Sequence, residues 1–170
     1  MNSGANRSEP PVRCFLGEFE HTVDAQRRIA IPSAWRSSDP GADHFILLPG
    51  RDQTLQLVPG ELFQEVLTKL RRVSFADAKA NVALATIGAM AQDCRLDKQA
   101  RVNLTARLMA HAGIRDRAVL VGAVTTIQIW EPAAWERQRM DSSHGLDVLQ
   151  AIQEKPDDLS DILRKAVRSP

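Results

Sequence analysis

The sequence predicts an α+β fold made of two similar halves, and three observations lead to this prediction. The chain repeats itself at a shift of 73 residues, several short segments alternate apolar and polar residues as strands do, and longer segments carry the apolar stripe of a helix. With 170 residues, of which 44% are hydrophobic and 25% are charged, the chain can bury a core of its own.

The repeat is clearest around two short turns. Residues 23–35 (VDAQRRIAIPSAW) align with residues 96–108 (LDKQARVNLTARL), so that an Asp, a Gln and an Arg recur in register. The same shift places the apolar segment 45–48 on the apolar segment 118–121. Agreement over a turn and a later strand indicates two copies of one supersecondary unit.

Each copy is expected to contain two strands joined by a tight turn, then a short helix, a β-hairpin and a longer helix. Pro32 ends the second strand, because proline has no N–H to continue a ladder. In the first half the expected strands are 15–23, 29–31, 45–48 and 55–58, and the expected helix is 61–72. An Ala-rich helix at 77–92 is expected to link the halves.

These elements divide the chain into four expected parts. A polar, Pro-containing leader at 1–12 is expected to be disordered, and 13–75 forms the first half. The linking helix and the second half occupy 76–144. The tail, 145–170, contains an amphipathic helix that is preceded by acidic residues and followed by basic ones, and we expect its apolar stripe to pack on the protein's own surface.

The sequence argues against an enzyme, a metalloprotein and a membrane protein. The longest apolar run, 82–90, is far shorter than a membrane helix, and the N-terminus lacks a secretory signal, so a cytoplasmic location is expected. The histidines are scattered, and Cys14 and Cys94 lie far apart and are expected to be buried. We therefore expect no catalytic residue, metal, cofactor or small-molecule ligand.

An Asp followed four residues later by an Arg occurs at both turns, as Asp24–Arg28 and as Asp97–Arg101. A single pair of this kind is common and contributes little as an exposed ion pair. Its recurrence in matching context is informative, because the net charge of the chain is only +1 while both turn segments are locally basic. A rigid turn on a two-stranded ribbon fits the major groove of DNA.

The segments FLGEFEHTVDAQRRIAIPSAWR, LDKQARVNL, HAGI, VLVG and IQIWEPAAWE resemble the MraZ family of bacterial transcription regulators. The resemblance runs from about Phe15 to about Trp135. It implies a swapped-hairpin AbrB-like fold with a β-barrel core, assembly into a closed homo-oligomeric ring, and binding to short direct repeats in double-stranded DNA upstream of a division and cell-wall gene cluster. The protein is then expected to be nucleoid-associated and to act as a repressor or an activator.

The resemblance also assigns roles at the turns. The turn aspartates of the family fall on Asp24 and Asp97, and its turn arginines fall on Arg28 and Arg101. Arg28, because an arginine can bridge two acceptors of guanine, is expected to be the main DNA contact.

Its neighbours Gln26 and Arg27 are expected to assist in the first turn. In the second turn, Lys98 and Arg101 are expected either to hold DNA phosphates or to stabilise the turn.

The residues before each turn arginine depart from the family pattern, and the role of the turns has an alternative. The family has Lys-Gly before the turn arginine, whereas this chain has Gln26-Arg27 and Gln99-Ala100. If this position has positive φ, a residue other than glycine costs about 1 kcal/mol. The alternative to DNA binding is a ring-forming scaffold or protein-interaction module, in which both turns form ion pairs between subunits.

Overall fold

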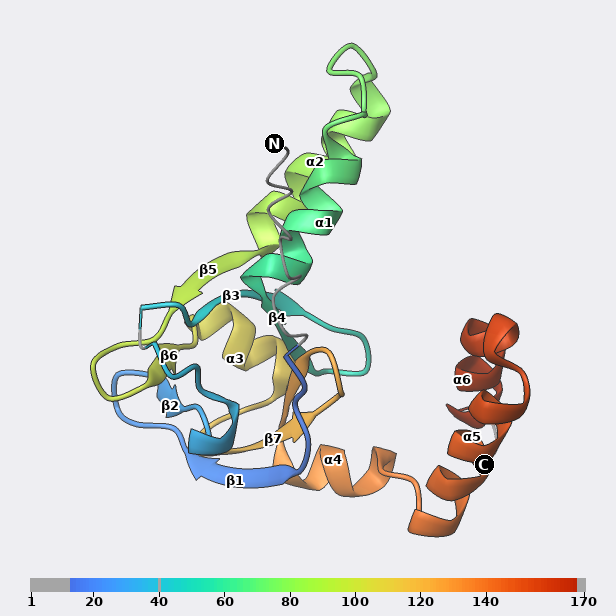
Figure 1. Cartoon of the computed structure of the whole chain (residues 1–170). Coiled ribbons are helices and arrows are strands. Elements are labelled where there is room, and N and C mark those ends of the chain that lie inside the picture. The colour runs from blue at the N-terminus through green and yellow to red at the C-terminus, as the bar shows by residue number, and fades with distance from the viewer. Residues whose placement is uncertain (1–12, 40, 168–170) are drawn as a thin grey trace, which may run out of the picture. The chain divides into compact units, whose positions relative to one another are not determined.

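A computed structural model describes residues 13–39 and 41–167 (Figure 1). The chain divides into two compact units, 1–132 and 133–170. The leader expected at 1–12 lies outside the described residues. No helix of the described part is long and apolar enough to cross a membrane.

The first unit alternates strands and helices in the order expected for two copies of one motif, and the α+β class is confirmed. Its elements are β1 (Glu18–Thr22), β2 (Arg28–Ala30), the 3-10 helix η1 (Ser33–Trp35), β3 (His44–Pro49), β4 (Leu55–Pro59), α1 (Gly60–Leu70), α2 (Ala78–Met90), β5 (Gln92–Arg95), β6 (Arg101–Asn103), α3 (Ala106–Ala112), β7 (Arg117–Gly122) and β8 (Ile127–Trp130).

The strands form two antiparallel sheets that the halves share. Six strands lie in the order β1-β7-β8-β4-β3-β5, and β2 pairs separately with β6. The pairs β1–β7, β2–β6 and β3–β5 each join one half of the chain to the other. The expected closed β-barrel is wrong, because β1 and β5 remain edge strands. The strands that follow them, β2 and β6, pair with each other and do not close the larger sheet.

The β2–β6 ribbon has one buried face and one outward face. Ile29 and Val102 are paired across the ribbon and are 0% and 1% exposed, because both belong to the hydrophobic core. Side chains alternate along a strand, so the flanking residues of both strands face outward. The core therefore fixes the position of the residues that adjoin the two turns.

The two cysteines differ in environment. Cys94 is buried as expected, and burial, with the charge of Asp93 as a smaller cause, raises the pKa of its thiol to about 12. Cys14 is exposed, so the expectation that it is buried was wrong. It comes just before Phe15, whose backbone pairs with Val124 in an isolated bridge that buries the Phe15 ring and not the preceding side chain.

The second unit is helical. It contains α4 (Pro132–Gln138), α5 (Ser142–Glu154), the 3-10 helix η2 (Pro156–Asp158) and α6 (Leu159–Val167). Asp141 caps α5 by accepting a hydrogen bond from the backbone N–H of His144 at 2.9 Å. Helix α6 begins and ends where the amphipathic pattern predicted a helix, and it packs against α5.

Candidate nucleic-acid interface

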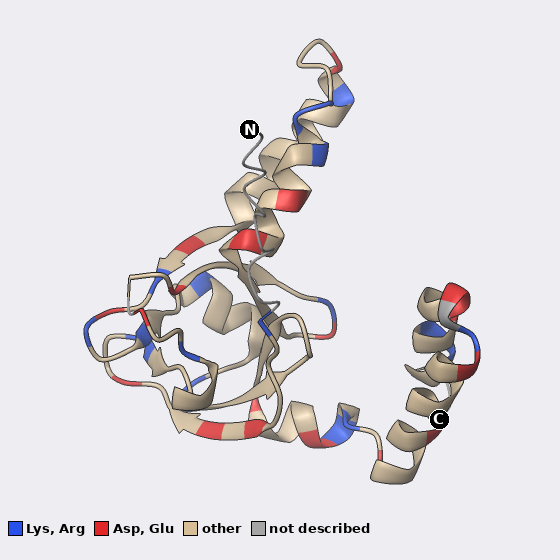
Figure 2. Cartoon of the chain, in the orientation of Figure 1, with Lys and Arg blue, Asp and Glu red and all other residues tan. Residues whose placement is uncertain are grey.

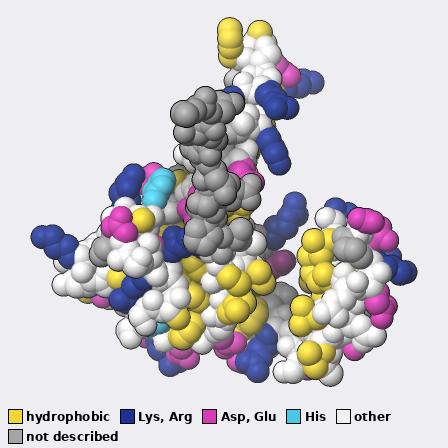
Figure 3. Space-filling view, in the orientation of Figure 1, with side chains coloured by type: hydrophobic (Ala, Val, Ile, Leu, Met, Phe, Trp, Pro, Cys, Tyr) yellow, Lys and Arg dark blue, Asp and Glu magenta, His cyan; other side chains and the backbone are white. Residues whose placement is uncertain are grey.

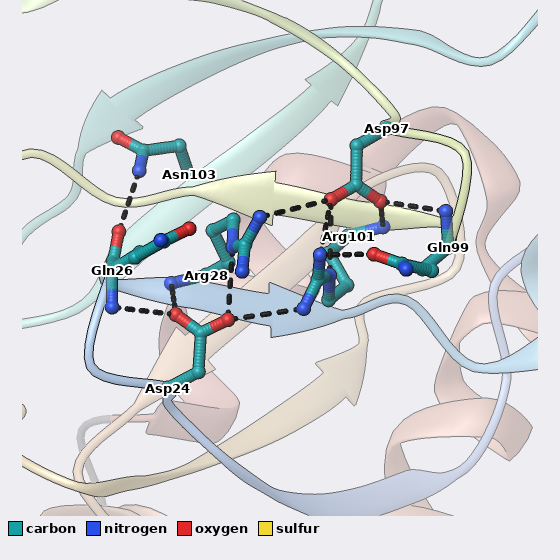
Figure 4. Close-up of polar contacts among 7 residues, drawn as sticks. All are labelled: Asp24, Gln26, Arg28, Asp97, Gln99, Arg101 and Asn103. Carbon is teal, nitrogen blue, oxygen red and sulfur yellow. Dashed lines mark hydrogen bonds and ion pairs between the residues drawn. The ribbon is translucent and has the colours of Figure 1, made fainter.

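The first turn is organised by one carboxylate. Oδ1 of Asp24 accepts hydrogen bonds from the backbone N–H groups of Gln26 and Arg28, both at 2.9 Å (Figure 4). The backbone N–H of Asp24 donates to the carbonyl oxygen of Arg28 at 3.0 Å and closes the turn. Arg27 lies between these anchors with φ of 60°, which places its side chain at the exposed tip.

The second turn repeats this geometry. Oδ1 of Asp97 accepts from the backbone N–H groups of Gln99 at 2.9 Å and Arg101 at 3.0 Å. Ala100 has φ of 57° and occupies the place that Arg27 holds in the first turn. Both positions, at which the resemblance implied a glycine, are therefore in the left-handed region, where an L-residue is strained.

Four side chains join the two turns across the outward face of the ribbon, and we call them the ion-pair ring: Asp24, Arg28, Asp97 and Arg101. Nε of Arg28 lies 2.9 Å from Oδ2 of Asp24, and its Nη1 lies 3.8 Å from Oδ2 of Asp97. Nη1 of Arg101 lies 3.1 Å from Oδ2 of Asp24, and its Nη2 lies 2.9 Å from Oδ2 of Asp97. Each carboxylate therefore pairs with both arginines.

The ring is formed within one chain and is neutral overall. All four side chains are between 22% and 32% exposed, so they are shielded by the ribbon but remain at its surface. The alternative interpretation required these ion pairs to form between subunits. In the structure the two aspartates and two arginines satisfy one another inside the chain.

Hydrogen bonding lowers the pKa of both carboxyl groups. The backbone N–H of Arg28 is the largest cause that lowers the pKa of Asp24, and the Arg28 side chain adds to it. Burial acts to raise the pKa of Asp97, but the backbone and side-chain hydrogen bonds of Arg101 outweigh it, and the pKa is lowered. Both aspartates are therefore held in the charged form.

The two arginines are not equivalent. Arg101 uses Nε, Nη1 and Nη2 in the ring, and its Nη2 also donates to the side-chain oxygen of Gln99. Arg28 uses Nε and Nη1, and its Nη2 meets no acceptor among the described residues. The first-turn arginine therefore has a side-chain nitrogen without a partner among the described residues, whereas all three side-chain nitrogens of the second-turn arginine have partners.

The tips of the two turns also differ in the cations that they expose. Arg27 and Lys98 are exposed, and neither forms an ion pair with another described residue. Ala100 offers no charge at the position equivalent to Arg27. Figure 2 marks Lys and Arg positions in blue along the loops that lead into β2 and β6. The first turn therefore presents a cation at its apex, and the second presents one beside its apex.

Asn103 supports the first turn and was not anticipated from the sequence. Its side-chain Nδ2 donates to the carbonyl oxygen of Gln26 at 2.9 Å, because β6 runs antiparallel to β2 and ends beside that turn. The equivalent position in the first copy is Ala30, which has no such donor. Only the strand register places Asn103 beside the first turn, so the repeat alone held no signal for it.

Comparison with known proteins places this geometry in a family. The family model described as "MraZ protein, putative antitoxin-like" matches residues 14–85 and 87–147. The chain belongs to the MraZ family.

Three relatives called transcriptional regulator MraZ illustrate the similarity. The protein of Lachnoclostridium phytofermentans is 34% identical over 128 residues, which are 75% of this chain and 89% of the relative. That of Herpetosiphon aurantiacus is 35% identical over 122 residues, which are 72% of this chain and 84% of the relative. That of Limosilactobacillus fermentum is 33% identical over 137 residues, with 81% and 94% covered. The MraZ match includes both turns and ends within α5.

The positive φ at the second turn gives a stability prediction. We expect Ala100→Gly to raise the free energy of unfolding by about 0.5–1 kcal/mol, because glycine adopts φ of 57° without strain. The matched control is Ala85→Gly, an exposed position inside α2, where glycine should lower stability by about 1 kcal/mol. Urea denaturation of the two variants measures both changes. A lower free energy of unfolding for Ala100→Gly would show that the backbone at this position is not strained.

The lowered pKa values of Asp24 and Asp97 give a prediction about acid stability. A carboxyl group whose pKa is lowered by folding contributes stability above its unfolded pKa of about 4, and this contribution is lost as the pH falls through the folded pKa. The double variant Asp24→Asn, Asp97→Asn should melt at a lower temperature than wild type at pH 7. Its melting temperature should then fall less between pH 5 and pH 2.

Circular dichroism melts over this pH range test the acid prediction. Asp116→Asn, at an exposed position outside the ion-pair ring, is the control and should follow the wild-type curve. Parallel pH curves for wild type and the double variant would show that the ring aspartates do not contribute to acid sensitivity.

Proposed function

We propose that this member of the MraZ family is a DNA-binding transcription regulator whose first turn contacts the bases. The observation that carries the proposal is the unequal pair of turns: Arg28 retains an uncommitted Nη2, and Arg27 stands exposed beside it on a fixed backbone. The name of the relatives, transcriptional regulator, supports the same function.

The ion-pair ring suggests how Arg28 meets a base. Its Nε is held by Asp24 at 2.9 Å, which fixes the plane of the guanidinium, while the contact of Nη1 with Asp97 is the longest of the ring at 3.8 Å. Giving up that long contact would free both terminal nitrogens for the O6 and N7 acceptors of guanine. Arg27 and Gln26 then assist at phosphates or neighbouring bases.

The second turn takes a supporting role in this proposal. Arg101 is fully engaged with Asp97, Asp24 and Gln99, so it acts as a structural member of the ring. Lys98 is exposed and positioned to pair with a phosphate. No catalytic role is proposed for any of these residues, because the turn groups balance one another's charge and none is arranged as a nucleophile with a base.

We also propose that the protein works as a homo-oligomeric ring on short direct repeats upstream of a division and cell-wall gene cluster, in the cytoplasm at the nucleoid. The strand exchange between the halves would be the intrachain form of a swapped hairpin. Helix α2 supports assembly: it is rich in apolar residues, none of its residues is buried, and Val82 is 69% exposed. An apolar helix of this kind needs cover from another chain.

Binding to a repeat-bearing duplex and to a scrambled duplex tests the site. We expect Arg28→Ala to remove the preference for the repeat, a loss of about 5- to 150-fold, because a bidentate guanine contact carries about 1–3 kcal/mol. Arg27→Ala should weaken binding to both duplexes and reduce the salt dependence. Arg101→Ala should weaken binding less or disturb the assembly. The measurement is fluorescence anisotropy at fixed salt, with duplexes taken from DNA upstream of the protein's own gene.

Arg51→Ala is the control for these variants, because Arg51 is an exposed cation in the β3–β4 loop, away from both turns. It should bind like wild type. Retention of wild-type discrimination by Arg28→Ala, with Arg51→Ala also unchanged, would remove the basis of the site.

Assembly is tested separately by light scattering after gel filtration. A ring requires heterologous contacts between successive copies, and two similar but unequal halves can supply them. We expect a single closed oligomer at micromolar concentration. A monomer at that concentration would contradict the ring while leaving the DNA contact of the first turn open to its own test.

A further inference from the structure

The outward face of the β2–β6 ribbon differs between its two ends. Arg28 lies directly opposite Asn103 across the ribbon, and Arg101 lies directly opposite Ala30. An amide therefore stands beside the arginine of the first turn, whereas a methyl group stands beside the arginine of the second turn. The two halves of the repeat thus place different groups at equivalent points of one surface.

The backbone of Asn103 is fixed on both sides. It pairs with Arg28 in the ribbon, and its carbonyl oxygen accepts a hydrogen bond from Nε2 of Gln92 in β5 at 2.9 Å. The next residue, Leu104, donates its backbone N–H to the carbonyl oxygen of Arg27 at 2.7 Å. The end of β6 is therefore held between β5 and the first turn, and the fold sets the point from which the Asn103 side chain projects.

The side chain of Asn103 is held at its nitrogen and available at its oxygen. Nδ2 donates to the carbonyl oxygen of Gln26 at 2.9 Å, whereas Oδ1 meets no donor among the described residues. Figure 4 shows the nitrogen directed toward Gln26 and the oxygen directed away from it. The side chain is exposed, and a primary amide has two N–H groups. One N–H and the carbonyl oxygen therefore remain available to a ligand.

A donor beside an acceptor on a fixed backbone suits adenine. In the major groove adenine presents its N6 amino donor beside its N7 acceptor, and an asparagine amide can bind both at once. Cross-strand neighbours in an antiparallel ribbon have Cα atoms about 5 Å apart, and successive base pairs are about 3.4 Å apart. A ribbon that places Arg28 at a guanine therefore places the Asn103 amide within about two base pairs of that guanine.

The two glutamines of the turns are less suited to this role. The side chain of Gln26 has no partner among the described residues, so it must be ordered when DNA binds, which costs affinity. The side-chain oxygen of Gln99 already accepts a hydrogen bond from Arg101. Asn103 therefore offers the amide that is both held and available.

The surface around the ribbon suits a polyanion. Arg27 and Lys98 are exposed at the two turns. Figure 3 shows Lys and Arg side chains at the surface on the left, the side on which Figure 1 draws the loops that lead into β2 and β6. Cations at these places can pair with phosphates while the outward face of the ribbon meets the bases.

We propose that Asn103 is a specificity-determining residue that reads an adenine close to the guanine bound by Arg28. This inference rests on the proposed function, because it requires the outward face of the ribbon to lie in the major groove. Each repeat is then read jointly by both halves of the chain, with an arginine from β2 and an asparagine from β6.

Binding to single-base variants of one repeat tests the proposal. The duplexes come from DNA upstream of the protein's own gene, and fluorescence anisotropy at fixed salt measures each affinity. Wild type is expected to prefer a guanine and, within about two base pairs, an adenine. Asn103→Ala should reduce the preference for that adenine by about 5- to 150-fold, the range for one bidentate contact, and should keep the guanine preference. Asn103→Gln, which retains the amide, should keep part of the adenine preference.

An adenine analogue with carbon in place of N7 separates base reading from support of the turn. Wild type should bind a duplex with the analogue more weakly than one with adenine, because the acceptor for the amide is gone. Asn103→Ala should bind both duplexes equally, since it lacks the donor. Gln64→Ala, which removes an exposed amide of α1, is the control and should behave like wild type.

Three results would overturn the proposal alone. They are a wild-type protein without an adenine preference near its guanine, equal weakening of all duplexes by Asn103→Ala, and the same response of wild type and Asn103→Ala to the analogue. In each case a guanine preference that Arg28→Ala removes would leave the proposed function standing. A wild-type protein with no base preference at all would contradict the proposed function and this inference together.

Discussion

The ion-pair ring is the constraint on which the proposed DNA-contacting surface depends. Two turns, 73 residues apart in the chain, are brought together because β2 pairs with β6, and each turn supplies one carboxylate and one guanidinium. Each carboxylate pairs with both arginines, so removing either Asp24 or Asp97 would take one ion-pair partner from each arginine. The ring thus couples the conformation of one turn to that of the other.

The two turns have nearly the same geometry, so only a few side chains distinguish one turn from the other. Gln99 engages Arg101, whereas no described residue binds the equivalent nitrogen of Arg28. Arg27 adds a cation where Ala100 adds none, and both bear the cost of positive φ. A strained position is retained when the surrounding structure holds it in place. In the proposed function, the first turn is the contact surface and the second turn supports its geometry.

Much of this arrangement could be predicted from the sequence, because the repeat and the turn chemistry are local. Residues only a few positions apart in the sequence are enough to predict the strand alternation, the turn aspartates, the strand end at Pro32 and the limits of α6. Closure of the sheet could not be predicted, because it depends on whether β2 pairs with β6 or with an edge strand, a long-range choice. Asn103 was missed for the same reason: its contact with Gln26 depends on strand register.

Site-specific photo-cross-linking tests whether the first turn lies on DNA. A photoreactive amino acid is placed at Arg27, the apex of the first turn, or at Arg72, an exposed cation beyond the end of α1. With a repeat-bearing duplex, we expect a protein–DNA cross-link from position 27 and little from position 72. Cross-linking from position 72 without cross-linking from position 27 would contradict it.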